Sequence, residues 1–215
     1  TQAMEEEYRV FTVTTFGDSI LDCGRYNEAD LDPARLLVRN DDGRFPEFRG
    51  RDLSARGPAR VEHRACDGAV VSDLAEQAVG LRMEEPAVAL VTIGGNDLLT
   101  GLVVDRGPGI DAFAARLADF VGVLPIRPVL LGNVYDPTFG DDRGNFLDVD
   151  PVLARSSYER VNAAIARVAE RYGTLVDLHA HFLTGDPSWF TNIIEPSLRG
   201  ASEVRRCFLR YVIPT

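Results

Sequence analysis

The chain has 215 residues, of which 45% are hydrophobic, and its formal net charge at pH 7 is −10. A chain of this length can bury one sizeable core, so we expect a single domain over residues 4–215. The negative charge disfavours nucleic acid and anionic membrane surfaces as partners, because both would repel it. No apolar run is long enough to span a bilayer.

Two local features bear on the extent of the domain and on the cellular location of the protein. Thr1 to Ala3 precede Met4 and resemble a cloning scar, so the predicted domain leaves them out. The three cysteines are odd in number, far apart and without the spacing of metal ligands. This usage is typical of a reducing cytosol, so we expect a cytoplasmic protein with no metal and no other cofactor.

Short apolar runs alternate along the chain with helical patterns. Apolar residues recur at i, i+3, i+4 and i+7 from Ile110 to Val121 and from Tyr158 to Tyr172, and a last helix is predicted from about Leu198. The predicted strands are Val10–Thr14, Ala59–Ala65, Val88–Ile93, Pro128–Val134 and Thr174–Leu178. Strands that alternate with helices predict an α/β protein with a parallel sheet and helices on both faces.

Small and polar residues follow three of these strands, at the carboxyl edge where parallel sheets collect their chemistry. They are Gly17-Asp18-Ser19, "CDGAVV" (Cys66–Val71) and "GGNDLL" (Gly94–Leu99). Each alone could be an ordinary turn. Together they offer a hydroxyl nucleophile and donors for an oxyanion, namely backbone N–H groups and an Asn amide.

The three stretches "FGDSILD", "CDGAVV" and "TIGGNDLL" resemble, in order and spacing, the first three blocks of the GDSL or SGNH hydrolase family. The resemblance implies a flavodoxin-like three-layer α/β/α sandwich, with a five-stranded parallel sheet in the order 2-1-3-4-5. It also implies hydrolysis of a small-molecule ester. Ser19 would be the nucleophile, and the oxyanion donors would be the backbone of Ser19, the backbone of Gly68 and the side chain of Asn96.

The fourth block of that family, Asp-x-x-His before the final helix, departs from the pattern here. Aligning Pro196 and Gly200 puts Glu195 at the histidine position and Asn192 at the aspartate position. An ordinary Glu has a pKa near 4.3 and His near 6.5, a gap worth about 3 kcal/mol in proton-transfer driving force. We expect burial to raise the pKa of Glu195, and Asn192 to donate a hydrogen bond to its carboxylate.

Other assignments stay open. His179 and His181 directly follow the last predicted strand, and strand alternation would point both to one side, so either is an alternative base. Their more ordinary role is a hydrogen-bonded loop pair, and no further ligand accompanies them for a metal. A catalytically silent protein that binds an acyl or carbonyl ligand is the alternative function. A nucleotide binder fits less well, because the first turn lacks the glycine-rich phosphate pattern.

Aromatic residues are predicted at the rim of the site. Tyr135, Trp189 and Phe190 lie in two long loops that leave the same sheet edge. Aromatic rings at a pocket mouth suit an acyl chain or a sugar face. The same rings could instead anchor the long loops to the core.

Overall fold

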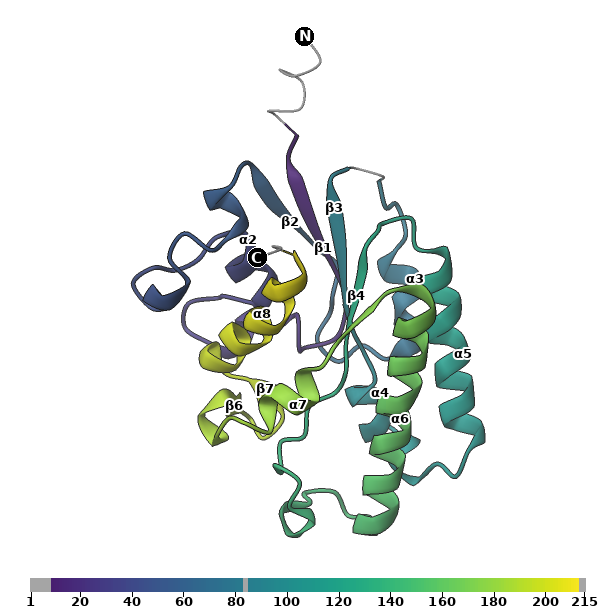
Figure 1. The fold of residues 1–215 in the computed structure, drawn as a ribbon. Helices are drawn as coiled ribbons and strands as arrows, with labels where there is room; N and C mark the ends of the chain where they lie inside the picture. Colours follow the sequence, from purple (N-terminus) through teal and green to yellow (C-terminus); the bar gives the residue numbers. More distant parts are fainter. Residues whose placement is uncertain (1–8, 83–84, 213–215) are drawn as a thin grey trace.

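The computed structural model describes residues 9–82 and 85–212. The suspected cloning scar, Thr1 to Ala3, lies outside the described residues. Within them, a five-stranded parallel sheet forms the centre of the protein, in the predicted order β2-β1-β3-β4-β5 (Figure 1). Its strands are β1 (Phe11–Gly17), β2 (Ala59–His63), β3 (Ala87–Thr92), β4 (Val129–Gly132) and β5 (Thr174–Val176).

Helices cover both faces of this sheet, which confirms the three-layer architecture. Successive residues of a strand face opposite sides, so Val88 and Leu90 of β3 pack into one hydrophobic cluster and Ala89 and Val91 into the other. The first cluster lies under α2 (Pro33–Val38), α7 (Leu178–Phe182) and α8 (Leu198–Val212). The second lies under α3 (Leu74–Gln77), α4 (Gly95–Leu99), α5 (Pro108–Val123) and α6 (Pro151–Tyr172).

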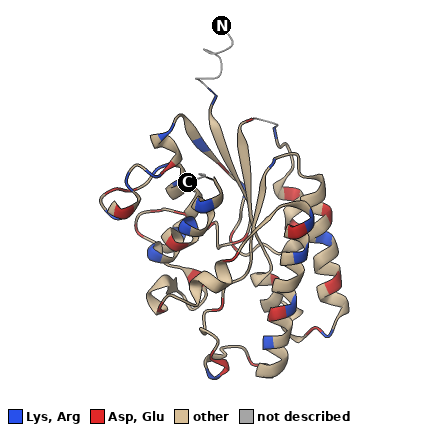
Figure 2. Ribbon diagram, in the orientation of Figure 1, with Lys and Arg blue, Asp and Glu red and all other residues tan. Residues whose placement is uncertain are grey.

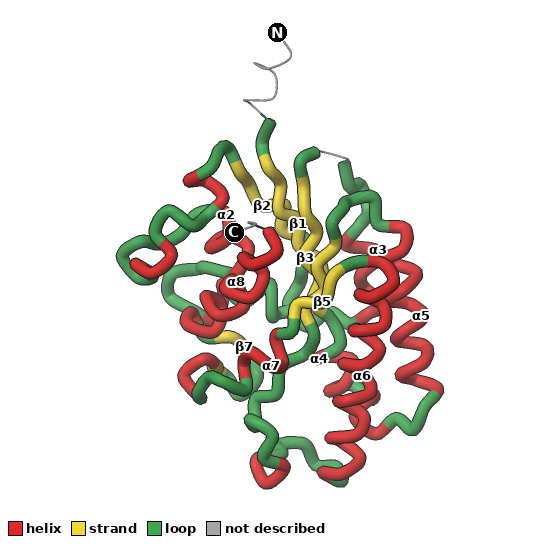
Figure 3. The backbone as a smooth tube through the Cα atoms, viewed as in Figure 1, coloured by secondary structure: helices red, strands yellow, loops and turns green. Residues whose placement is uncertain are grey.

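The two sides of the sandwich are visible in Figure 1, where α2 and α8 lie on one side of the sheet and α5 and α6 on the other. A small antiparallel hairpin, β6 (Phe190–Thr191) and β7 (Glu195–Pro196), precedes α8. Loops and short helices gather where the strands end (Figure 3). This edge of the sheet carries the polar turns described below.

The last strand is shorter than the sequence predicts. β5 ends at Val176, and the residues after it form α7. Asp177 caps this helix, because its side chain accepts a hydrogen bond from the N–H of Ala180. The prediction that His179 and His181 alternate along a strand is therefore wrong.

Acidic and basic residues are interspersed along α5, α6 and α8 (Figure 2). The negative charge of the chain is thus not confined to one of these helices. No helix in the described part of the chain is both long and apolar enough to cross a membrane. All three cysteines are free, two of them buried and Cys66 exposed.

Candidate active site

Ser19 lies directly after β1, in a turn that requires a glycine at position 17. Gly17 has a φ of +115°, and a Cβ there would lie 1.7 Å from the carbonyl oxygen of Thr92. The Gln77 side chain brackets Gly17: its Oε1 accepts from the Gly17 N–H at 2.7 Å, and its Nε2 donates to the Gly17 carbonyl at 2.9 Å. The turn therefore holds Ser19, 7% exposed, at the carboxyl edge of the sheet.

Asp18 stabilises this turn through hydrogen bonds of its side chain and its backbone N–H. Its Oδ1 accepts hydrogen bonds from Thr92 Oγ1 at 2.9 Å and from the N–H of Ile20 at 3.1 Å. Its own N–H donates to the Thr92 carbonyl at 3.0 Å. Burial raises the pKa of Asp18 to about 7; the two hydrogen bonds on Oδ1 oppose this rise, and the nearby Glu195 adds to it.

The second and third predicted turns are joined to each other. Asn96 in α4 donates from Nδ2 to the Ala69 carbonyl at 3.0 Å. Both carboxylate oxygens of Asp97 accept from the N–H of Val71 at 3.1 Å. These bonds fix the Asn96 side chain against the loop after β2, as a donor of fixed orientation requires. Within residues 9–82 and 85–212, the second N–H of the Asn96 amide has no hydrogen-bond acceptor and is left for a ligand.

Gly68 belongs to the turn that follows β2. Its φ is +84° and it is exposed. The residue before it, Asp67, donates its N–H to Asp22 Oδ2 at 2.8 Å, and the N–H of Cys66 donates to the Gly17 carbonyl at 2.9 Å. The structure therefore ties the turn of Gly68 to the turn of Ser19.

Glu195 reaches the site on the β6–β7 hairpin. Thr191 pairs with Glu195 across the two strands. Tyr135, which follows β4, donates its hydroxyl to the Ile194 carbonyl at 2.6 Å, and its ring stacks on Phe182 with centroids 4.7 Å apart. The hairpin is thus anchored one residue before Glu195, which is 8% exposed.

The Glu195 carboxylate and the Ser19 side chain meet in this site. Burial raises the pKa of Glu195, the charge of Asp67 adds to the rise, and a hydrogen bond with the Ser19 side chain opposes it. Among the described residues, Glu195 Oε2 is buried without a hydrogen-bond partner. A carboxylate beside a hydroxyl, with its pKa moved toward neutrality, is suited to accept the hydroxyl proton.

Asn192 does not have the place that the sequence suggests. It lies exposed in the turn of the hairpin, with a φ of +47°, and its carbonyl accepts from the N–H of Ile194 at 2.9 Å. It takes no part in the interactions that set the pKa of Glu195. The expected hydrogen bond between Asn192 and Glu195 is therefore wrong. Burial, Ser19 and Asp67 set the pKa of the Glu195 carboxyl. The residue that anchors the hairpin is Tyr135.

The two alternative bases, His179 and His181, each pair with another side chain. His179 Nδ1 is 2.6 Å from the hydroxyl of Tyr158, and His181 Nε2 is 2.7 Å from Glu203 Oε2. Neither lines the cavity that contains Ser19. Residues 9–82 and 85–212 bring together no group of three or more His, Cys, Asp or Glu side chains that could hold a metal ion.

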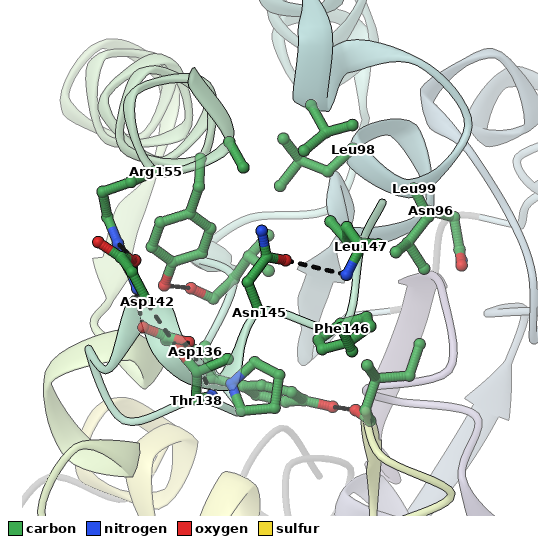
Figure 4. Close-up of a pocket in the computed structure, with 18 of the residues that line it drawn as sticks. Asn96, Leu98, Leu99, Asp136, Thr138, Asp142, Asn145, Phe146, Leu147 and Arg155 are labelled. Atoms are coloured by element: carbon green, nitrogen blue, oxygen red, sulfur yellow. Dashed lines mark hydrogen bonds and ion pairs between the residues drawn. The ribbon is translucent and has the colours of Figure 1, made fainter. Parts of the chain in front are cut away.

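A cavity of about 140 Å³ opens beside Ser19 and Asn96. Figure 4 shows that Leu98, Leu99 and Leu147 line one side. The opposite side carries charged and polar groups that pair with one another, since Arg155 bonds to Asp136 Oδ2 at 2.7 Å and to Asp142 Oδ1 at 2.9 Å (Figure 4). One wall of the cavity is therefore apolar, and the charged groups of the opposite wall are paired within the protein.

Of the three predicted rim aromatics, Tyr135 alone lines this cavity in the described structure. Trp189 is buried against Phe182, with ring centroids 5.1 Å apart, and Phe190 packs edge-on to Tyr135 at 5.0 Å. Trp189 and Phe190 therefore anchor the hairpin to the core, and their assignment to the substrate rim is corrected. Phe146, 43% exposed, occupies the rim instead.

Sequence reasoning treated Asp18 only as part of a turn, although the structure makes it a buried ionisable group of the site. A signal was present: Asp18 follows the apolar run "VFTVT" by only four residues, and a carboxyl so close to the end of a buried strand has no easy access to water. The bond from Asp67 to Asp22 gave no such signal. It joins residues 45 positions apart, and only the fold brings them together.

Comparison with known proteins identifies the family of the chain. Residues 15–201 match the model of the GDSL-like lipase/acylhydrolase family. Over 112 residues the chain is 31% identical to a GDSL esterase/lipase of Arabidopsis thaliana. That match covers 52% of this chain and 30% of the plant protein, so the chain spans less than a third of the length of this relative.

Solved structures of similar fold include one enzyme from a bacterium and one from an environmental metagenome. Axe2, an acetylxylan esterase from Geobacillus stearothermophilus, is 19% identical with a TM-score of 0.67, over 96% of this chain and 95% of that one. LAE5, an alpha/beta hydrolase enzyme from the metagenome of Lake Arreo, Spain, is 24% identical with a TM-score of 0.65, over 94% of each chain. Two other structures are of catalytic mutants of Axe2, one replacing a serine and one a histidine.

Proposed function

Because the chain belongs to the GDSL-like lipase/acylhydrolase family, we propose that it is an ester hydrolase with Ser19 as its nucleophile and Glu195 as its base. The observation that carries this proposal is that the buried Glu195 carboxyl interacts with the side chain of Ser19, which lines the cavity, and that this interaction opposes the rise in the Glu195 pKa caused by burial. The neighbour Axe2, whose catalytic mutants include a histidine, has the same fold. In the present chain the glutamate takes the place of a histidine base.

The reaction follows from this geometry in two steps. Ser19 Oγ attacks the ester carbonyl carbon while its proton passes to Glu195, and the tetrahedral intermediate then expels the alcohol, which takes that proton. Water next attacks the acyl-serine with Glu195 again as the base, which releases the acid and restores Ser19. The backbone N–H groups of Ser19 and Gly68 and the amide of Asn96 are the proposed oxyanion donors.

The cavity favours a small ester with an apolar group on one side of the carbonyl. Its leucine wall offers no hydrogen bonds, and the ion pairs of Arg155 opposite are satisfied within the protein. A cytoplasmic location is part of the proposal and rests on the three free cysteines. Turnover of p-nitrophenyl acetate, followed at the release of nitrophenolate, tests the activity; an inert but folded protein would favour the silent binder of an acyl or carbonyl ligand.

Asn96→Ala is expected to lower kcat for p-nitrophenyl acetate by about a hundredfold, the usual loss when one oxyanion donor is removed. KM should change little, because the donor acts mainly on charge that develops in the transition state. Steady-state kinetics on the wild type and the variant measure this. Thr100→Ala is the matched control, since its hydroxyl donates to the backbone carbonyl of Asn96 and to no other group in the described part of the chain. An equal loss in both variants would contradict the role of the amide.

A further inference from the structure

Two buried carboxyl groups lie near Ser19: Asp18, which lines the cavity beside it, and Glu195, which interacts with the Ser19 side chain without lining the cavity. Asp18 is 2% exposed and Glu195 is 8% exposed, and the charge of Glu195 raises the cost of ionising Asp18. None of the groups that shift the pKa of Asp18 is a cation. Two full negative charges here would also oppose the oxyanion that forms on an ester carbonyl. The site is therefore best suited to reaction when one of the two carboxyls keeps its proton.

The hydrogen bonds indicate which carboxyl that is. Among the described residues, both bonds to the Asp18 side chain fall on Oδ1, which accepts from Thr92 and from Ile20. Oδ2 takes part in neither and faces Gly95, where an added Cβ would lie 3.9 Å from it. This division fits a carboxylic acid, whose carbonyl oxygen accepts and whose hydroxyl oxygen donates. Asp18 and Gly95 both line the cavity.

We propose that Asp18 works as a neutral carboxylic acid whose Oδ2–H donates a hydrogen bond to the reacting ester oxygen, while Glu195 alone is ionised and acts as the base. This inference rests on the proposed ester hydrolysis. No proton leaves Asp18 during the reaction, since its role is to stabilise charge on the substrate. A protonated carboxyl can then supply the donor that a backbone or amide N–H supplies at other oxyanion sites.

The charged and titratable groups around Asp18 are consistent with this state. Glu195 faces it from β7 and Asp97 from α4, and both act to keep the Asp18 proton in place. Tyr135, whose pKa burial raises well above its usual range, faces it from the loop after β4 as a neutral group. Thr92 on β3 is neutral and donates to Oδ1.

The test is the pH dependence of kcat/KM for p-nitrophenyl acetate in the wild type and in Asp18→Asn. The wild type should lose activity as pH rises through about 7, where the buried Asp18 carboxyl ionises, and the loss should approach about tenfold per pH unit above that. Asn keeps an acceptor at Oδ1 and a donor in place of the hydroxyl. Asp18→Asn should therefore stay active below neutral pH and lose the alkaline decline.

Asp97→Asn is the matched control, because burial also raises the pKa of Asp97. It should keep the alkaline decline. The proposal is overturned if the wild type shows no decline, if Asp18→Asn is folded yet inactive at every pH or keeps the decline, or if Asp97→Asn alone removes it. Folding is checked for each variant by thermal unfolding and near-ultraviolet circular dichroism.

A readout independent of activity separates this inference from the proposed function. The infrared spectrum at pH 6 should contain a carboxylic-acid C=O band that Asp18→Asn lacks and that disappears from the wild type at alkaline pH. If the wild type is inert towards esters but shows this band, the hydrolase proposal fails and the neutral Asp18 stands. Absence of the band in an active enzyme overturns the neutral Asp18 alone.

Discussion

Replacing Ser19 with alanine should reduce the turnover of p-nitrophenyl acetate to the uncatalysed background, a loss on the order of a millionfold for a serine nucleophile. The reason is that Ser19 is the one hydroxyl among the groups that shift the pKa of Glu195, and the proposed acyl-enzyme forms on this hydroxyl. The measurement is kcat/KM under conditions where the background hydrolysis is subtracted.

Ser72→Ala is the matched control, because Ser72 is exposed on the surface away from the cavity lining. It should leave the kinetics unchanged. Turnover that survives in Ser19→Ala at the wild-type rate would place the chemistry at another residue. A comparable Tm for the two variants and the wild type ensures that the loss reflects chemistry.

Glu195→Gln should lower kcat by about a thousandfold or more, since the amide keeps the shape of the side chain and cannot accept the Ser19 proton. The pH dependence of wild-type activity also tests whether Glu195 is the base. Burial raises the pKa of Glu195 above its usual value, so activity should fall as pH drops through this raised pKa and the base becomes protonated. Because that pKa belongs to a carboxyl, activity should persist in mildly acidic solution, where a histidine base would already be charged.

The control for Glu195 is the double variant His179→Ala/His181→Ala. Neither ring lines the cavity: His179 pairs with Tyr158, whose own side chain does line it, and His181 pairs with Glu203, which does not. We therefore expect kcat to change little while the chain stays folded. The reverse outcome, with the histidine variant inert and Glu195→Gln active, would make a histidine the base and leave Glu195 a packing residue.

The fold and the nucleophile turn could be predicted because their signals are local. Alternating apolar runs and helical periods identify a parallel sheet without reference to distant residues. The glycine at position 17 is needed where β1 meets Thr92 of β3, and a glycine before an acid and a serine is visible in the sequence itself. The order of the strands and the layers of helices follow from these elements and the family resemblance.

The side-chain partners around Glu195 could not be predicted in the same way. Placing Asn192 beside Glu195 assumed the geometry of an Asp-x-x-His block, whereas the chain folds there into a hairpin that turns Asn192 outward. The anchor of that hairpin, Tyr135, is 59 residues from the carbonyl it binds. Trp189 and Phe190 were assigned to the rim for their chemistry, but tertiary packing decided their place.

The central claim is that Ser19 is a nucleophile activated by Glu195, and labelling with a fluorophosphonate tests it most directly. The wild type should form one covalent adduct, located at Ser19 by peptide mass spectrometry. The rate of labelling should fall strongly in Glu195→Gln and stay close to the wild-type rate in His179→Ala/His181→Ala. A folded wild type that remains unlabelled, or that carries the adduct on another residue, would contradict the account.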